Sequence, residues 1–167
     1  MQNDFSLRPV NVDDLEAISE IYAFAVASRQ TAHTEPPLSA YWRNWFKSHS
    51  AKYSAFILLI GKQVAGFASI SPYREGRQAF KNVAEISYYL HPDHQRKGGG
   101  TFLVDALIKH CSANGFRHLV AILLGSNTAS ISLLEKTGFK KWGEMPGIAE
   151  FGEAFTSHLY YGKHLKK

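Results

Sequence analysis

The sequence has one cysteine among 167 residues, so no disulfide can form within the chain. Cys111 lies in a pattern of helical spacing, where a small core residue is expected. A chain of this length can bury roughly 70% of its unfolded surface and needs neither a disulfide nor a metal to fold. The single cysteine fits a cytoplasmic location, which we expect.

Long apolar runs are also missing. The longest, Ala55 to Ile60, is far too short to cross a bilayer. Residues 1–7 lack the basic segment and apolar run of a secretory signal, so we expect no membrane association. There is no internal repeat and no low-complexity linker, which predicts a single domain over residues 1–167.

Strong clustering of charge is absent as well. The formal net charge is +5, but the basic residues are scattered and the tightest groups are pairs such as Arg96-Lys97 and Lys140-Lys141. No basic stripe of five or more residues forms, so we expect no nucleic-acid partner. The remaining interpretations of the positive charge are a polyanionic small ligand and an ordinary solvated surface.

Hydrophobic periodicity predicts a mixed α/β (α+β) order. Strands are predicted at residues 5–9, 53–60, 64–71, 83–90, 118–124, 139–144 and 155–161. Helices are predicted after the caps Asn11 and Ser39, from Gly100 to Ala113, and after Asn127. This order predicts a sandwich built on one mixed, mostly antiparallel sheet of six to seven strands, flanked by about four helices.

The segment from Tyr88 to Gly100 carries the strongest chemical signal. A strand ends, a basic loop with Arg96 and Lys97 follows, and glycines open an amphipathic helix. Glycine lets the backbone approach a ligand closely, and free N–H groups at a helix start attract anions. The segment therefore predicts a cradle for an anionic ligand, against the alternative of a plain glycine-rich turn. It fits neither a Walker loop nor the dinucleotide fingerprint.

Two segments together resemble a known family. Gln95-x-x-Gly98-x-Gly100 resembles the acetyl-CoA pyrophosphate motif of the GNAT family of N-acetyltransferases. Residues 127–139 resemble the Asn-x-x-Ser helix ending in Gly-Phe of the same family. Ile21-Tyr22 and Thr34-Glu35-Pro36 resemble the phosphinothricin acetyltransferase branch, which acetylates the amino group of amino acids such as phosphinothricin and methionine sulfoximine. The resemblance implies the GNAT fold over nearly the whole chain.

The resemblance implies acetyl-CoA as cosubstrate. Backbone groups of residues 88–90 would pair with its pantetheine arm, and the Asn127 side chain would bond to it while also serving as a helix cap. Gly99 departs from the family pattern, where an apolar residue is commoner, and we expect a slightly looser loop. The implied cofactor-binding residues are Tyr88, Tyr89, Leu90, Gln95, Arg96, Lys97, Gly98, Gly99, Gly100, Thr101, Asn127 and Ser130.

Acetyl transfer needs a neutral amine, so a base must remove a proton. Glu85 lies within an otherwise apolar strand, where alternation puts it on one face with Ser87 and Tyr89. The resemblance supports Glu85 as the catalytic base, and the alternative is a solvent-facing strand residue. Tyr160, or else its neighbour Tyr161, is the candidate acid for the departing thiolate, against the alternative that each is a packed aromatic.

An acceptor carboxylate would need a cation. Arg74 and Arg77, in the loop before the Glu85 strand, can bind a carboxylate in bidentate fashion, although each is as readily a solvated loop charge. Some relatives carry a histidine where this chain has Leu134 and an aspartate at Ser157, so these departures bear on the acceptor. The expected substrate-binding residues are Glu35, Tyr73, Arg74, Arg77 and Phe80.

The eight histidines include one close pair, His91-x-x-His94. Pro92 places this pair in a loop, and no acidic or cysteine partner is spaced for zinc, so we expect no metal. The sequence therefore favours an acetyl-CoA-dependent N-acetyltransferase for a small-molecule amine. The alternatives are acetylation of a protein N-terminus or a polyamine, and a non-catalytic CoA-binding module. A homodimer is expected from the resemblance alone.

Overall fold

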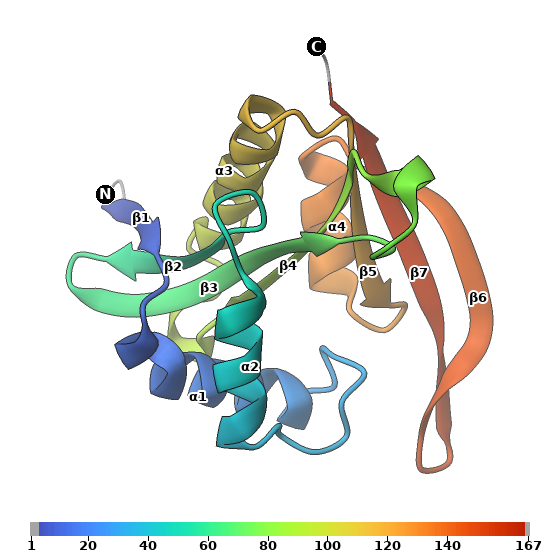
Figure 1. The fold of residues 1–167 in the computed structure, drawn as a ribbon. Coiled ribbons are helices and arrows are strands. Elements are labelled where there is room, and N and C mark those ends of the chain that lie inside the picture. The colour runs from blue at the N-terminus through green and yellow to red at the C-terminus, as the bar shows by residue number, and fades with distance from the viewer. Residues whose placement is uncertain (1–3, 166–167) are drawn as a thin grey trace.

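Seven strands form one mixed sheet in the computed structural model, which describes residues 4–165 (Figure 1). The sheet order is β1-β2-β3-β4-β5-β7-β6, and every neighbouring pair is antiparallel except β4–β5. The predicted fold class is confirmed, while the extent of the domain over residues 1–167 stays a prediction. The strands are β1 (Phe5–Pro9), β2 (Ala55–Ile60), β3 (Gln63–Pro72), β4 (Val83–Leu90), β5 (His118–Leu124), β6 (Lys140–Phe151) and β7 (Ala154–His164).

Four α-helices cover the two faces of the sheet. They are α1 (Leu15–Ala27), α2 (Ser39–Ser48), α3 (Gly99–Ala113) and α4 (Thr128–Lys136), and short 3₁₀ turns lie at Val12–Asp14, Gln78–Phe80 and Pro92–His94. Helices α1 and α2 pack on one face and α3 and α4 on the other. Adjacent residues of β2 show the two layers, because Ile57 joins the first core and Leu58 the second. Both faces of β2 are buried, which explains its unbroken apolar sequence.

Two predicted boundaries are wrong. Ser39 is the first residue of α2, and the cap position is taken by Leu38, whose side chain makes no capping bond. The closing strands were predicted at residues 139–144 and 155–161. In the structure they extend over Lys140–Phe151 and Ala154–His164, and β6 runs through Pro146-Gly147, where its register with β7 shifts between Met145 and Ala149.

Other local expectations are confirmed. Asn11 caps the first helical turn by accepting from the Asp13 amide at 2.9 Å. Cys111 is fully buried in the core under α3, and burial raises the pKa of its thiol to about 12. The thiol is therefore neutral at physiological pH, as expected for a packing residue.

An ion pair joins β1 to the start of α1. Both guanidinium nitrogens of Arg8 donate to the buried carboxylate of Asp14, at 2.7 and 2.6 Å. The same carboxylate accepts from the Asn11 amide at 2.8 Å. The bonds from Arg8 lower the pKa of Asp14 below its usual value, and the bond from the Asn11 amide adds to this effect.

We expect Asp14→Asn to lower the free energy of unfolding by about 1–2 kcal/mol at pH 7, a range set low because Arg8 is partly exposed. Since the folded pKa of Asp14 is depressed, its contribution is present above the unfolded pKa of about 4 and is lost as pH falls through the folded pKa. Urea unfolding of both proteins at pH 7 and pH 3 measures this. The exposed Asp13→Asn variant is the control, and a difference that does not shrink at low pH would contradict the prediction.

Candidate active site

The parallel pair β4–β5 separates soon after it forms. Among the residues that the structure describes, Val83–Glu85 are the only part of β4 paired with β5, at His118–Val120. Beyond this point the inner edge of each strand is unpaired. A cleft of about 280 Å³ lies between the two edges, with Ile86–Leu90 on one wall and Ala121–Leu123 on the other.

Helix α3 begins at the open end of this cleft. Its N-cap, Gly98, has a φ of +91°, and the nearby Arg96 has a φ of +58°. Within residues 4–165, the amides of Gly98, Gly99, Gly100 and Thr101 donate to no other residue. Free N–H groups at a helix start favour an anion, so this end of the cleft suits a phosphate group.

Most of the predicted cofactor residues line the cleft, and two do not. Lys97 donates from Nζ to the Asp93 carbonyl at 2.7 Å. Gly99 is buried, and a Cβ there would lie 3.1 Å from Leu58, so this position packs against the core. The residues that do line the cleft are Tyr88, Tyr89, Leu90, Gln95, Arg96, Gly98, Gly100, Thr101, Asn127 and Ser130.

Polar side chains at the start of α4 lie at the cleft, and one of them contacts β4. Asn127 caps α4 by accepting from the Ser130 amide at 3.2 Å, as predicted. The NH₂ group of the Asn127 side chain remains available as a donor at the cleft. On the facing wall, burial raises the pKa of Tyr88 to about 12, an effect that its bond with Ser130 partly offsets. The Tyr88 hydroxyl is therefore neutral.

Glu85 lies where β4 and β5 separate, next to Ile86, and is not itself among the residues that line the cleft. It is the last residue of β4 paired with β5, opposite Val120, and it lies beside Ser71 of β3. The side chain is half-buried, and burial raises the pKa of its carboxyl. A carboxyl with a raised pKa binds a proton more readily than an exposed one, which suits proton transfer.

The alternation of β4 separates two environments. Ile86, Tyr88 and Leu90 pack with the core beneath α3 and α4, whereas Tyr89 packs with the core beneath α1 and α2. Glu85 therefore shares the face of Tyr89. The helix start that forms the anion cradle belongs to the layer on the opposite face.

Tyr160 lies on the same face as Glu85. It is paired with Ile122 of β5 and stands two residues from Gly162, which is paired with Val120, the partner of Glu85. Strand β5 therefore separates Tyr160 from Glu85. The role of Tyr160 as an acid stays a prediction.

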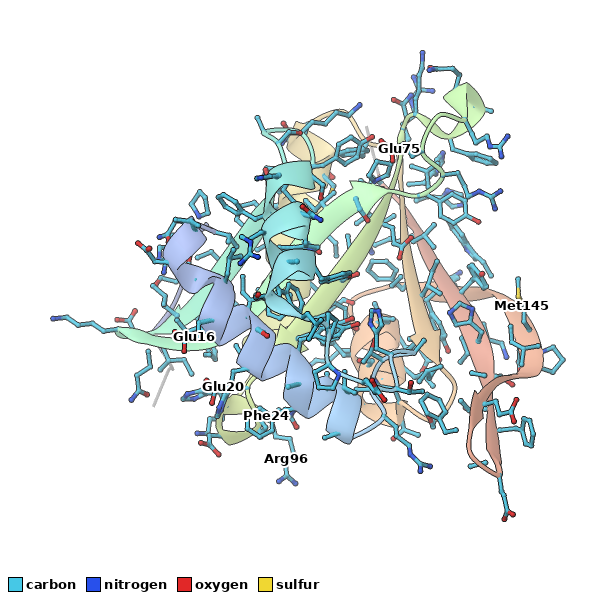
Figure 2. The ribbon with its side chains drawn as sticks, turned by 60° about the horizontal axis from the view of Figure 1, so that its bottom comes forward. Glu16, Glu20, Phe24, Glu75, Arg96 and Met145 are labelled. Atoms are coloured by element: carbon cyan, nitrogen blue, oxygen red, sulfur yellow. The ribbon has the colours of Figure 1, made fainter. Side chains whose placement is uncertain are left out.

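The predicted substrate-binding residues lie outside the cleft. Arg74, Arg77 and Glu35 are exposed, and the rings of Tyr73 and Phe80 pack edge to face at 5.6 Å. Figure 2 shows Glu75, from the same loop as the two arginines, and Arg96 of the cradle at opposite ends of the molecule. The loop lies nearer to Glu85 than to the cradle, because Pro72 is paired with Ala84, the residue before Glu85.

Sequence reasoning missed part of the cleft. Ala121–Leu123 form one wall with apolar side chains only, so no chemical signal marks them. Gln30, from the segment after α1, and Leu134 of α4 also line the cleft. These residues come together only through the packing of the helices.

A buried hydroxyl cluster was also missed. Tyr22 of α1 shares hydrogen bonds with Thr31 at 2.7 Å and with Nδ1 of His33. Burial raises the pKa of Tyr22 and, further, of Tyr89. The cluster ties the loop between α1 and α2 to the strand that forms one wall of the cleft. The spacing of Tyr22 on its helix predicted only a core residue.

Within residues 4–165, no three His, Cys, Asp or Glu side chains are grouped to hold a metal ion. In the predicted pair, His91 instead accepts from the Asp93 amide at 3.3 Å through Nδ1. Across the same part of the chain, no helix has both the length and the apolar character needed to cross a membrane.

Comparison with known proteins agrees with this geometry. The model of the acetyltransferase (GNAT) family matches residues 16–139. YwnH of Bacillus subtilis is 35% identical over 147 residues, which cover 87% of this chain and 90% of YwnH. The L-methionine sulfoximine/L-methionine sulfone acetyltransferase of Pseudomonas aeruginosa is 31% identical over 150 residues, 87% of this chain and 86% of that protein.

Solved structures show the same arrangement. The phosphinothricin acetyltransferase of Sinorhizobium meliloti, in complex with AcCoA, superposes with a TM-score of 0.91 at 29% identity. The match covers 99% of this chain and 89% of that chain.

Gly98→Ala tests the cradle. At a φ of +91° any other residue is strained, and the helix start should shift. We expect a loss of about 1 kcal/mol in stability together with at least a tenfold loss of affinity for CoA, measured by calorimetry. Gly76→Ala is the matched control, because Gly76 has a φ of +73° in an exposed turn away from the cleft. It should lose similar stability and keep its affinity; equal CoA affinity in the two variants would contradict the prediction.

Proposed function

Because the chain belongs to the acetyltransferase (GNAT) family, we propose that it transfers the acetyl group of acetyl-CoA to the amine of a small molecule. One observation supports the proposal: the cleft between β4 and β5 has the free amides of α3 at its open end, and the half-buried carboxylate of Glu85 lies next to its other end, where the two strands separate. An elongated ligand with a phosphate at one end and a reactive carbonyl at the other fits these two ends.

The residues present fit acetyl-CoA. The amides from Gly98 to Thr101 would hold the pyrophosphate, with Arg96 at the rim. The unpaired edge of β4 at Tyr88–Leu90 would pair with the amides of the pantetheine arm as an added strand does. The Asn127 side chain, on the facing wall, would donate to the same arm.

Glu85 would act as the base. Its carboxylate lies on the face opposite the cradle helix, so an amine can approach from there while the thioester lies in the cleft. The amine nitrogen attacks the thioester carbonyl, the amine proton passes to Glu85 directly or through water, and the thiolate leaves with a proton. Tyr160, on the same face, would supply that proton. A backbone N–H near Leu90 would stabilise the oxyanion.

The favoured acceptor is an amino-acid derivative of the phosphinothricin or methionine sulfoximine type. The names of the P. aeruginosa and S. meliloti relatives support this class. Arg74 and Arg77, in the loop that follows the strand beside Glu85, would bind its acidic group, and Tyr73, Phe80 and Glu35 would complete the pocket. A protein N-terminus or a polyamine is the alternative acceptor.

Glu85→Gln should lower kcat by about 10²-fold or more, because an amide cannot accept the proton. Burial raises the pKa of Glu85, so wild-type activity should fall as pH drops through that raised value. The activity of Glu85→Gln should not show this fall. Thiol release from acetyl-CoA, followed from pH 5 to 9 with a panel of amino acids, measures both effects. Glu153→Gln, in the exposed turn between β6 and β7, is the control.

Two results would count against this proposal in different ways. A Glu85→Gln variant with wild-type kcat would remove the base from the mechanism and leave the activity. A wild-type protein that binds CoA but releases no thiol with any amine would favour the non-catalytic CoA-binding module.

We also propose a homodimer, from the family resemblance, and a cytoplasmic location. Met145 and Ile148 are exposed on β6 and offer an apolar surface for a second copy; Figure 2 shows Met145 at the outer edge of the sheet. Light scattering should give a mass near twice 18.7 kDa. A monomeric mass at micromolar concentration would contradict the dimer.

A further inference from the structure

Strand β6 carries an irregularity at Trp142. Lys141 is paired with Tyr161 and Gly143 with Tyr160, so Trp142 is left between them without a partner on β7. A bulge of this kind turns a side chain away from its regular direction. Trp142 is 46% exposed although it is the largest type of apolar side chain.

The indole of Trp142 is held in place by its neighbours. It lies against Gly162, where a Cβ would overlap three atoms of the six-membered ring. Its ring is also 4.9 Å from the ring of His164. Nδ1 of His164 in turn lies 2.8 Å from Nδ1 of His118. The missing side chain of Gly162 therefore leaves the space that the indole occupies.

Gly162 belongs to the same row of the sheet as Glu85. Glu85 is paired with Val120, and Val120 is paired with Gly162. Paired residues on neighbouring strands point to the same face, so the indole lies on the face of Glu85. Two strand spacings separate Glu85 from Gly162, which is about 10 Å between Cα atoms.

This part of the face is left uncovered by the helices. The core beneath α1 and α2 draws its sheet residues from β2, β3 and β4 only, among them Ile57, Phe67 and Tyr89. Helices α3 and α4 cover the opposite face. An apolar ring therefore borders a stretch of sheet that no helix covers and that begins at Glu85. Val120, between Glu85 and Gly162 in this row, is only 5% exposed, so packed side chains form the floor between Glu85 and the indole.

We propose that Trp142 forms the wall of the acceptor site against which the side chain of the amine substrate packs while its amine reaches Glu85. The inference rests on the proposed function and adds a residue that determines specificity. The exposed part of the indole and the carboxylate of Glu85 lie on the same face, so one amino acid can contact both. A flat indole face favours an aromatic or sulfur-containing side chain over a short one.

The experiment measures thiol release with four acceptors of increasing side-chain size: glycine, alanine, methionine and phenylalanine. In Trp142→Ala we expect KM for methionine and phenylalanine to rise about tenfold or more. The values of kcat, the KM for acetyl-CoA and the KM for glycine and alanine should stay within about twofold of wild type. Changes confined to the long acceptors are what a packing wall requires, and a purely structural role would not produce them.

Gly162→Ala gives an independent test, because a methyl group there must displace the indole. It should reproduce the same selective rise in KM. Phe155→Ala is the matched control: Phe155 is 64% exposed near the outer end of the same hairpin, far along β7 from Gly162, and should behave as wild type. If the Gly162→Ala variant does not fold, the Trp142→Ala variant still decides the question.

Two results for Trp142→Ala would contradict the proposal that Trp142 is a wall of the acceptor site. One is an equal rise in KM for all four acceptors; the other is a loss of stability or of dimer mass with unchanged KM. If the wild type acetylates none of these acceptors and no amine in the broader panel, the proposed function is at fault; whether or not it acetylates another amine, binding is then read without turnover. Methionine or phenylalanine should then quench the tryptophan fluorescence of the wild type and not that of Trp142→Phe; no quenching in either protein also overturns the proposal.

Discussion

The early separation of β4 from β5 is the constraint on which the whole site depends. β4 is paired with β3 from Ala84 to Leu90, and β5 with β7 along its full length, but within residues 4–165 the two strands share only three residue pairs. The sheet therefore consists of two well-paired halves joined over a short distance. Backbone groups on the inner edges beyond Glu85 and Val120 must find other partners, and an extended ligand is the partner that the cleft admits.

The helices turn this opening into a site with two sides. Helix α3 follows β4 after the loop of residues 91–98, and its free amides lie at one end of the cleft. Helix α4 follows β5 after a short loop that supplies Asn127. Both helices lie on one face of the sheet. Because residues alternate along β4, Glu85 points to the other face, so the place proposed for the phosphate-bearing ligand and the place proposed for the amine lie on opposite faces.

Local sequence patterns predicted the elements well where the chemistry is local. The apolar run of β5 and the glycines that open α3 need only neighbours in the chain to be interpreted. The prediction was wrong where a neighbouring strand decides the outcome: β6 runs through Pro146-Gly147 because pairing with β7 tolerates an irregularity there. Leu38 takes the cap position of α2 in place of Ser39, although serine is the better capping residue.

By itself, the sequence determined the strand and helix order and which residues are candidates for the anion cradle and the base, because each rests on residue types at fixed short spacing. The tertiary structure alone decided which residues meet across the sheet. Val120 and Gly162 carry no functional side chain, yet their register places Gly162 in the row of Glu85. The indole of Trp142 lies against Gly162, and so it comes near a residue about 57 positions away in the chain. The wall at Ala121–Leu123 has the same origin: strand pairing, set by burial of both faces, places residues that no local pattern relates.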